Sequence, residues 1–377
     1  MRSRVIRSLH FRPLAVSLAA LIVVGACGGG AASPAAPTAA PTTAPTAGPS
    51  GEVPSPDAAA VIADLRSRLD GQRFIFGSSA FPNASIAGAF KTLEFLREDF
   101  GVNAEFRLLD SDPLVAAMIS GQVQIGALSL AGMANARSAG ADLMAIGADD
   151  QKNTFLVASK DPIESMEELR GQPFAVTQNL NQITGQTARK CLATAGLDIE
   201  QDVQLLRLSN TGEATQAIRS GQVKGGISAT FRLTGLRLQD GDVYNILCRG
   251  WEANPQISTV WIATNDFVSQ NGDLALALNI ASLKSARWMK ESRDEWIELV
   301  TREVEGLTAE AAAIDYETLV VELDNWPVNG SLDRDLCQQT LDTSLEFDAI
   351  DRAYTVDELV DFSYQDRAVE ILGEGSS

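Results

Sequence analysis

The sequence predicts an α/β protein of two related lobes, each a mainly parallel sheet flanked by helices, with extra helices at the C-terminal end. From Arg73 onward, strand-like apolar segments alternate with helix-like segments over short connections, which is typical of parallel sheets covered on both faces. A segment that begins at Ala117 also returns at Ala217, which indicates two units built alike. Hydrophobic residues make up 45% of the 377-residue chain, enough to bury a substantial core.

The N-terminal residues resemble an export signal of the lipoprotein type. Four arginines precede an apolar run of 11 residues, Leu14–Val24, which is too short to span a bilayer but suits the apolar region of a signal peptide. The small residues before Cys27 and the glycines after it resemble the bacterial lipobox. We expect residues 1–26 to be removed and Cys27 to carry lipid, which would hold the protein at the outer face of the cell membrane. An ordinary signal peptide with an unrelated cysteine is the alternative.

Residues 27–57 are predicted to be a tether. Seven of the 14 prolines lie between Ala31 and Pro56, among alanine, threonine, serine and glycine. Proline lacks a backbone donor and favours extended polyproline geometry, so we expect a semi-rigid spacer between the lipid and the folded body.

The first lobe is predicted to contain three strands that alternate with two helices. We expect the strands at Arg73–Gly77, Asn103–Leu109 and Val123–Leu128, and the helices at Ala84–Phe100 and Pro113–Ser120.

The repeat places a similar corner in the second lobe. Residues 117–126 and 217–226 share six identities at an offset of 100. In both copies, glycine at 121 or 221 is placed to end a helix, and valine at 123 or 223 is expected to open a buried strand. Convergence of helix–glycine–strand corners is the alternative explanation. The chain from Asn271 onward is helical in pattern, and we expect its helices to pack across lobe one with Trp288 and Trp296 in the core.

Composition excludes several kinds of chemistry. The one histidine, His10, lies in the segment expected to be removed, so the mature chain would lack a Ser-His-Asp triad and a His-ligated metal site. Loss of that segment would lower the formal charge from −19 to −23, because it holds four arginines and no acid. Such an acidic chain is a poor partner for nucleic acid. No cofactor or metal is expected.

Candidate ligand-binding residues follow the strands, because ligands of open α/β sheets bind beyond the carboxyl ends of strands. These loops are rich in hydroxyl and amide groups, hold no acid, and contain one arginine. Each polar residue could instead cap a helix or form a turn. The candidates are Ser78, Ser79, Phe81, Asn83, Ser129, Leu130, Asn179, Gln182, Thr184, Gly185, Gln186, Thr230, Phe231 and Arg232, with Trp251 or Trp326 as more distant stacking partners.

Three cysteines remain after Cys27. Cys191 and Cys248 could form a disulfide that leaves Cys337 free, or all three could be buried thiols. The sequence leaves both readings open.

Residues 154–176 resemble the crossing between lobes in type II periplasmic binding proteins of ABC importers. The shared pattern is a strand, a Lys-Asp pair at 160–161, a short helix ended by glycine, and a new strand. The two repeated corners and the helix that ends at Gly196-Leu197 resemble further elements of that family. The resemblance covers about residues 72–305, and its nearest branch binds taurine, alkanesulfonates, nitrate, thiamine-precursor pyrimidines or riboflavin. One departure is Gln124 and Lys224, where many members carry an acid nearby.

The resemblance implies a monomeric two-lobed clamp that closes on a small molecule and delivers it to an ABC permease. A separate ATPase would supply energy, because this sequence holds no P-loop motif. The implied divisions are lobe one at 58–159, lobe two at 160–258, and a return to lobe one with C-terminal helices at 259–377.

Two kinds of ligand fit the loops. Their amides and phenylalanines favour a neutral heterocycle such as riboflavin or a thiamine-precursor pyrimidine. Helix N-termini with Arg232 as counter-charge would instead suit taurine, a sulfonate or nitrate. The heterocycle is preferred.

Two other classes are disfavoured. Enzymes of this fold that make hydroxymethylpyrimidine or menaquinone precursors rely on histidine, which the mature chain would lack. Acid pairs such as Asp149/Asp150 and Asp110/Asp112 are expected on the solvated surface rather than in a catalytic site. A scaffold lipoprotein would not need two repeated α/β lobes.

Overall fold

The computed structural model describes residues 56–160 and 162–376. The expected signal segment, the lipidation site Cys27 and the tether up to residue 55 lie outside these residues. The described part begins with helix α1 (Pro56–Leu69). In the part of the chain that the structure describes, no helix has the length and apolar character needed to cross a bilayer.

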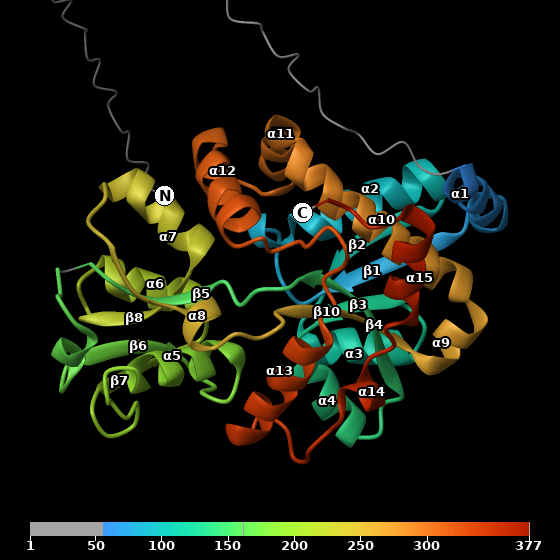
Figure 1. Ribbon diagram of the computed structural model, residues 1–377. Coiled ribbons are helices and arrows are strands. Elements are labelled where there is room, and N and C mark those ends of the chain that lie inside the picture. The colour runs from blue at the N-terminus through green and yellow to red at the C-terminus, as the bar shows by residue number, and fades with distance from the viewer. Residues whose placement is uncertain (1–55, 161, 377) are drawn as a thin grey trace, which may run out of the picture. The chain divides into compact units, whose positions relative to one another are not determined.

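Lobe one is built on a five-stranded sheet in the order β2-β1-β3-β10-β4 (Figure 1). Strands β1, β2 and β3 are parallel, whereas β10 runs antiparallel to both β3 and β4. The strands are β1 (Arg73–Ser78), β2 (Asn103–Leu108), β3 (Ile125–Leu128), β4 (Leu143–Asp150) and β10 (Thr259–Thr264). Its helices are α2 (Ala87–Phe100, preceded by the 3-10 turn Ala84–Ile86), α3 (Ser111–Ile119) and α4 (Leu130–Ser138).

Lobe two repeats this plan with the order β7-β6-β8-β5-β9. Strands β6, β7 and β8 are parallel, and β5 is antiparallel to β8 and β9. The strands are β5 (Phe155–Ser159), β6 (Pro173–Thr177), β7 (Gln204–Leu208), β8 (Gly225–Ala229) and β9 (Asn245–Arg249). Its helices are the 3-10 turn Met166–Leu169, α5 (Ile183–Ala193), α6 (Thr211–Arg219), α7 (Thr230–Asp240) and α8 (Gly250–Ala253). The predicted two-lobed fold is confirmed, with one antiparallel strand in each sheet.

Strand β1 shows why the first sheet is buried on both faces. Phe74 and Phe76 belong to one core cluster with Trp261, whereas Ile75 belongs to a different cluster. Successive strand residues point to opposite faces, so this apolar run supplies both layers of helices with contacts.

The repeated corners adopt the same conformation in both lobes. Gly121 and Gly221 follow α3 and α6 with φ of 72° and 71°, a left-handed backbone that suits glycine. The expectation that Val123 and Val223 open strands is wrong by two residues: both are buried before β3 and β8 begin.

The chain crosses between the lobes at residues 151–154 and 254–258. Strand β5 was expected in lobe one, whose boundary was placed after residue 159. It pairs instead with β8 and β9 in the second sheet. The apolar pattern of a strand does not show which sheet the strand joins. The boundary between the lobes was therefore predicted after β5, whereas the chain crosses before it.

The C-terminal helices contact both lobes. Helix α10 packs against α2 and α15 on lobe one, as expected. Helix α12, however, packs against α7 of lobe two, and Lys190 of α5 forms an ion pair with Glu346 of α13 (2.8 Å). Trp296 is buried as predicted, whereas Trp288 is only partly buried. The helices are α9 (Asn265–Gln270), α10 (Gly272–Glu291), α11 (Arg293–Glu303), α12 (Ala309–Tyr316) with the π-helical turn Glu317–Glu322, α13 (Arg334–Glu346), α14 (Val356–Leu359) and α15 (Ser363–Leu372).

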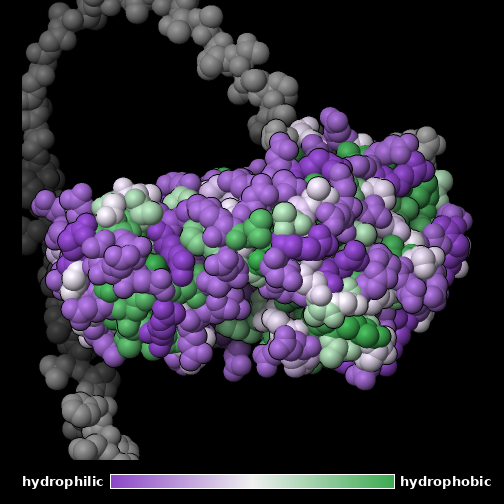
Figure 2. Space-filling view, turned by 90° about the horizontal axis from the view of Figure 1, so that it is seen from below, coloured by the Kyte–Doolittle hydropathy of each residue, from purple (hydrophilic) through white to green (hydrophobic). Residues whose placement is uncertain are grey.

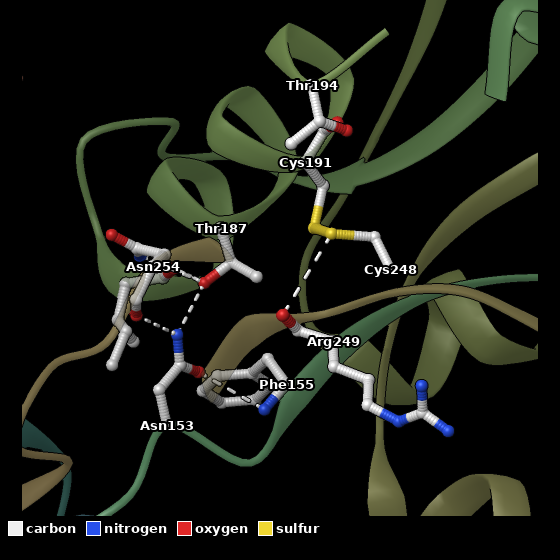
Figure 3. The surroundings of a disulfide bond; sticks show 9 residues. Asn153, Phe155, Thr187, Cys191, Thr194, Cys248, Arg249 and Asn254 are labelled. Carbon is white, nitrogen blue, oxygen red and sulfur yellow. Dashed lines mark hydrogen bonds between the residues drawn. A yellow bond between two sulfur atoms is a disulfide. The ribbon is translucent and has the colours of Figure 1, made fainter. Parts of the chain in front are cut away.

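A disulfide joins Cys191 of α5 to Cys248 of β9 (Figure 3), with Cα atoms 5.8 Å apart. Cys337 is a buried free thiol. Of the two readings left open by the sequence, the structure therefore has the disulfide.

Figure 3 also shows a polar network beside this disulfide. The Asn153 amide donates to the Thr187 hydroxyl and to the Asn254 carbonyl, both at 2.9 Å. Asn153 and Asn254 lie on the two crossings, and Thr187 lies on α5 one turn before Cys191. The network therefore ties both crossings to the helix that the disulfide anchors.

Candidate functional site

A cleft of about 920 Å³ lies between the two lobes. The loops after β1 and β3 of lobe one, and the starts of α5 and α7 of lobe two, line it. Sequence-predicted residues that line it are Ser79, Phe81, Asn83, Ser129, Leu130, Asn179, Gln182, Thr184, Gln186, Phe231 and Arg232. Their shared position follows from the fold, since the carboxyl ends of both sheets face one another across the crossings.

Five candidates do not line the cleft: three loop residues and the two tryptophans. Ser78 is buried, with its hydroxyl bonded to the backbone of Ala80 (3.1 Å). The Thr230 backbone N–H donates to the Thr154 carbonyl (3.2 Å), and the side chain is buried at the start of α7. Gly185 packs against the backbone of Leu180, where a Cβ would come within 2.3 Å of the Leu180 Cα.

The tryptophans proposed for stacking pack elsewhere. Trp251 and Trp326 contact the cluster around Trp296 and Tyr316 instead of lining the cleft. An indole is large enough to serve as core or as a ligand platform, and its sequence position does not distinguish the two.

On the lobe-one side, two polar side chains cap helices. The Ser129 hydroxyl accepts the backbone N–H of Gly132 at the start of α4 (3.1 Å), and the Asn83 carbonyl oxygen accepts that of Ser85 (2.9 Å). These donors are already satisfied by the chain itself.

On the lobe-two side, helices α5 and α7 begin without a side-chain cap. The first N–H groups of a helix lack partners within it and carry the positive end of its dipole. Gln182 and Thr184 at the start of α5, and Phe231 and Arg232 at the start of α7, face the cleft. This side therefore offers donors to a negative group.

The Arg232 guanidinium lies between two aromatic rings. Its central carbon is 5.1 Å from the centroid of Phe81 and 5.1 Å from that of Phe231. The Nε atom has no hydrogen-bond partner, and partial burial lowers the pKa of this guanidinium. Among the described residues no carboxylate forms an ion pair with it, so its positive charge is left for a ligand.

The structure also brings acids to the cleft that the sequence analysis missed. Asp150 from the end of β4 and Asp348 and Asp351 from the segment after α13 line it. The expectation that Asp149 and Asp150 are solvated is wrong, since both are buried. Burial is the largest cause that raises the pKa of Asp150, to about 7, while hydrogen bonds from Thr259 and Ser258 lower it.

Further lining residues come from the second crossing and from α13. They include Gln256, Ser258 and Thr259, and Thr340 and Ser344. Had β4 been predicted from the sequence, the rule about carboxyl ends of strands would have placed Asp150 at the cleft. No local motif marks the others, because tertiary packing brings them to the cleft.

Figure 2 shows one face of the protein, on which hydrophilic residues predominate and hydrophobic ones form small groups. The net charge of −19 is consistent with this surface. Arg232, which forms no ion pair with any carboxylate in residues 56–160 and 162–376, is therefore a local positive site in an acidic protein.

Solved structures that share this fold at low sequence identity include two sulfonate-binding proteins and a nitrate-binding protein. The periplasmic aliphatic sulphonate binding protein SsuA from Escherichia coli is 18% identical, with a TM-score of 0.61 over 78% of this chain and 99% of that one. The alkanesulfonate-binding protein SsuA from Xanthomonas axonopodis pv. citri, bound to MOPS, is 16% identical, with a TM-score of 0.58 over 78% and 99%. The periplasmic nitrate-binding protein NrtA from Synechocystis PCC 6803 is 13% identical, with a TM-score of 0.61 over 80% and 89%.

The family match covers more than half of the chain. No curated protein sequence matches significantly. Residues 62–277, however, match the family described as ABC transporter, phosphonate, periplasmic substrate-binding protein. The two sheets, the cleft between them and this match agree, and the chain therefore belongs to that family of substrate-binding subunits of ABC importers.

Proposed function

We propose that the cleft binds an organic oxyanion of the sulfonate or phosphonate class and delivers it to the permease of the importer. The observation that carries this proposal is Arg232, a half-buried guanidinium in the cleft without a carboxylate partner among the described residues. Guanidinium groups form two parallel hydrogen bonds to such anions. A neutral ligand would leave this guanidinium without a direct ion-pair partner among the described residues.

Two further features support an anion. Helices α5 and α7 begin uncapped at the cleft, and helix N-termini are ready-made anion sites. The cleft volume of about 920 Å³ is also within the range of small-molecule sites. An oxyanion with an organic group would place its charge at Arg232 and its apolar part against the phenylalanine rings.

This proposal reverses the preference for a neutral heterocycle. Riboflavin and pyrimidines were preferred because the loops contain amides, phenylalanines and no acid, whereas the structure leaves the Arg232 guanidinium in the cleft without an ion-paired carboxylate among the described residues. The acids Asp150, Asp348 and Asp351 also line the cleft and do not themselves favour an anion. The similar structures described above are sulfonate- and nitrate-binding proteins. One of them holds MOPS, which joins a sulfonate to a ring, so an anionic group and a ring are compatible within this fold.

Binding would shift an equilibrium between open and closed arrangements of the lobes. The ligand would contact α5 and α7 on one side and the loops after β1 and β3 on the other. A ligand shifts such an equilibrium only by its difference in affinity for the two states. The two crossings at 151–154 and 254–258 are the only covalent links between the lobes' sheets among the described residues, and they are the expected hinge.

The experiment is a thermal-shift and calorimetric screen of the purified protein. The panel holds alkanesulfonates, MOPS, alkylphosphonates, nitrate, riboflavin and a thiamine-precursor pyrimidine. A ligand at 100 times its dissociation constant stabilises the fold by about 2.7 kcal/mol. Stabilisation by sulfonates or phosphonates supports the proposal, and a response to riboflavin or the pyrimidine alone would refute it.

We also propose that Cys27 is lipidated and that the protein acts as an anchored monomer. The lipobox-like residues before Cys27 support the anchor. Metabolic labelling with palmitate should mark the wild-type protein and not Cys27→Ser, and the variant should appear in the soluble fraction. Size-exclusion chromatography with light scattering would test the monomer.

A further inference from the structure

A second cavity of about 560 Å³ adjoins the ligand cleft. It lies between the loop after β1, the start of α7, and the segment that joins α11 to α12. Its lining comprises Phe81, Pro82, Asn83, Ala84, Phe231, Glu303, Val304, Glu305, Gly306, Leu307 and Asp315. These lining residues include three acids and no base, which is the opposite of the charge that Arg232 brings to the first cleft.

Asp315 is the unusual member of this set. Its side chain is 0% exposed, and neither carboxylate oxygen has a hydrogen-bond partner. Burial raises the pKa of Asp315 to about 7, and the nearby Thr234 hydroxyl offsets this only in part. That hydroxyl donates to the Thr230 carbonyl at 3.2 Å. Buried carboxylates are rarely left without donors, because the lost hydration is costly. A hydrogen-bond donor from a bound ligand would therefore stabilise the Asp315 carboxylate.

The walls around Asp315 fit a cation attached to carbon. Pro82, Val304 and Leu307 supply apolar surface, and Phe81 and Phe231 supply aromatic rings. Cations bind to the faces of such rings, and Arg232 already does so from the side of the cleft. An ammonium group offers three N–H donors, enough for both oxygens of a carboxylate.

We propose that this cavity binds the ammonium group of an organic amine, with the Asp315 carboxylate as its counter-charge. Glu305, which is exposed, would raise the local concentration of cations at the cavity mouth. Glu303, also exposed, contributes less because it pairs with Arg302 (2.9 Å). A metal ion is not the proposed occupant, because in the described ranges no three His, Cys, Asp or Glu side chains are grouped to hold one.

The site is a property of this chain's C-terminal helices. Asp315, Glu303 and Glu305 all follow residue 277, where the family match ends. Phe81, Asn83 and Phe231 line both cavities, so the amine has two possible sources. It is either part of the transported oxyanion, which rests on the proposed function, or a separate alkylamine.

The experiment compares matched ligands by calorimetry with the full folded protein. Taurine is paired with ethanesulfonate and homotaurine with propanesulfonate, so that each pair differs in one amino group. Propylamine alone forms the separate arm. The variants are Asp315→Asn, which removes the charge and keeps the shape, and Glu310→Gln, which changes an exposed acid on the same helix outside the cavity.

We expect at least one amino-sulfonate, or propylamine, to bind about tenfold tighter to wild type and Glu310→Gln than to Asp315→Asn. Ethanesulfonate and propanesulfonate should bind equally well to all three proteins. If Asp315→Asn does not fold, the double variant Glu303→Gln/Glu305→Gln at the exposed mouth replaces it, with a smaller loss expected.

The two sources give different results. An advantage of amino-sulfonates over their partners places the amine on the transported molecule, whereas binding of propylamine without that advantage indicates a separate ligand. If sulfonates bind but neither an amino group nor propylamine shows dependence on Asp315, the cavity proposal is wrong and the proposed function stands. If no sulfonate binds, the propylamine arm still decides the cavity proposal.

Discussion

The Arg232 guanidinium of lobe two stacks on the Phe81 ring of lobe one, with 5.1 Å between its carbon and the ring centroid. The contact spans the cleft, because Phe81 follows β1 and Arg232 lies in the first turn of α7. The charge that would hold an anion is thus positioned by an aromatic ring from the opposite lobe. Ligand binding and lobe closure are therefore both expected to depend on the contact between Arg232 and Phe81.

Arg232→Ala should weaken oxyanion binding by about 10- to 100-fold, which corresponds to losing a charge-assisted hydrogen bond of about 1.5–3 kcal/mol. Arg232→Lys should recover only part of the affinity, because an ammonium cannot form the paired bonds of a guanidinium. Calorimetry measures both changes. Arg170→Ala is the matched control, since Arg170 is an exposed arginine of lobe two that pairs with Asp202 and does not line the cleft. An equal loss of oxyanion affinity in the two alanine variants would show that Arg232 does not bind the ligand.

Phe81→Ala should separate organic anions from inorganic ones. The ring is 48% exposed, so its removal should change the free energy of unfolding little. A ligand with a ring, such as MOPS, would lose apolar contact and bind several-fold more weakly, whereas nitrate has no organic part to lose. The ratio of the two dissociation constants is the measurement. A loss of the same size for both ligands would show that Phe81 acts only by positioning Arg232.

Removal of the disulfide should destabilise lobe two. The bond between Cys191 and Cys248 closes a loop with a sequence separation of 57 residues, and a cross-link of that span is worth about 2–4 kcal/mol. Cys191→Ala/Cys248→Ala should therefore unfold at lower urea concentration than wild type. Because the bond anchors α5 beside the hinge network, ligand affinity should fall as well. Cys337→Ala serves as the control for loss of a buried sulfur.

Stability should fall as the pH rises from about 4 to about 7. Burial raises the pKa of Asp150 from its ordinary value of 3.8 to about 7, so between these values the folded chain retains a proton that the unfolded chain has lost. The folded state is then favoured at the acidic end, and the penalty is complete above about pH 7. Asp150→Asn should weaken this dependence without abolishing it, because burial also raises the pKa of Asp149 and raises that of Asp315 to about 7. Asp294→Asn, at a 93% exposed side chain, should leave the curve unchanged.

The sequence was sufficient for the architecture because its signals are local. Period-two and helical patterns, and glycines such as Gly121 and Gly221 with φ near 70°, are visible in short windows. The order of the strands is not local. Whether β5 joins the first or second sheet depends on its partners β8 and β9, which lie roughly 70–90 residues further along the chain.

The site was predictable only where it follows a strand. The loops after β1, β3, β6 and β8 were found by one geometric rule, and most of their candidates line the cleft. Packing of α13 brings Asp348 and Ser344 to the cleft. No sequence motif in the loops predicts that position. Trp251 shows the converse error, because an aromatic residue near a strand end was assigned to a ligand and packs in a core instead.

Gly185→Ala should distort the start of α5. A Cβ at Gly185 would lie 2.3 Å from the Cα and 2.5 Å from the carbonyl oxygen of Leu180, so the loop that carries Asn179 and Gln182 must shift. Such overpacking costs about 1–3 kcal/mol. We expect a lower melting temperature and an oxyanion affinity reduced several-fold, because the uncapped N–H groups of α5 would move away from the cleft.

Gly235→Ala provides the matched control for this change. Gly235 also lies inside a helix, α7, but nothing comes within 4 Å of a Cβ built there. Alanine favours a helix over glycine by up to about 1 kcal/mol, so this variant should be slightly more stable than wild type and bind the ligand equally well. If Gly185→Ala behaves like Gly235→Ala in both melting temperature and affinity, the start of α5 does not contribute to the anion site, and the donors must be sought at α7 alone.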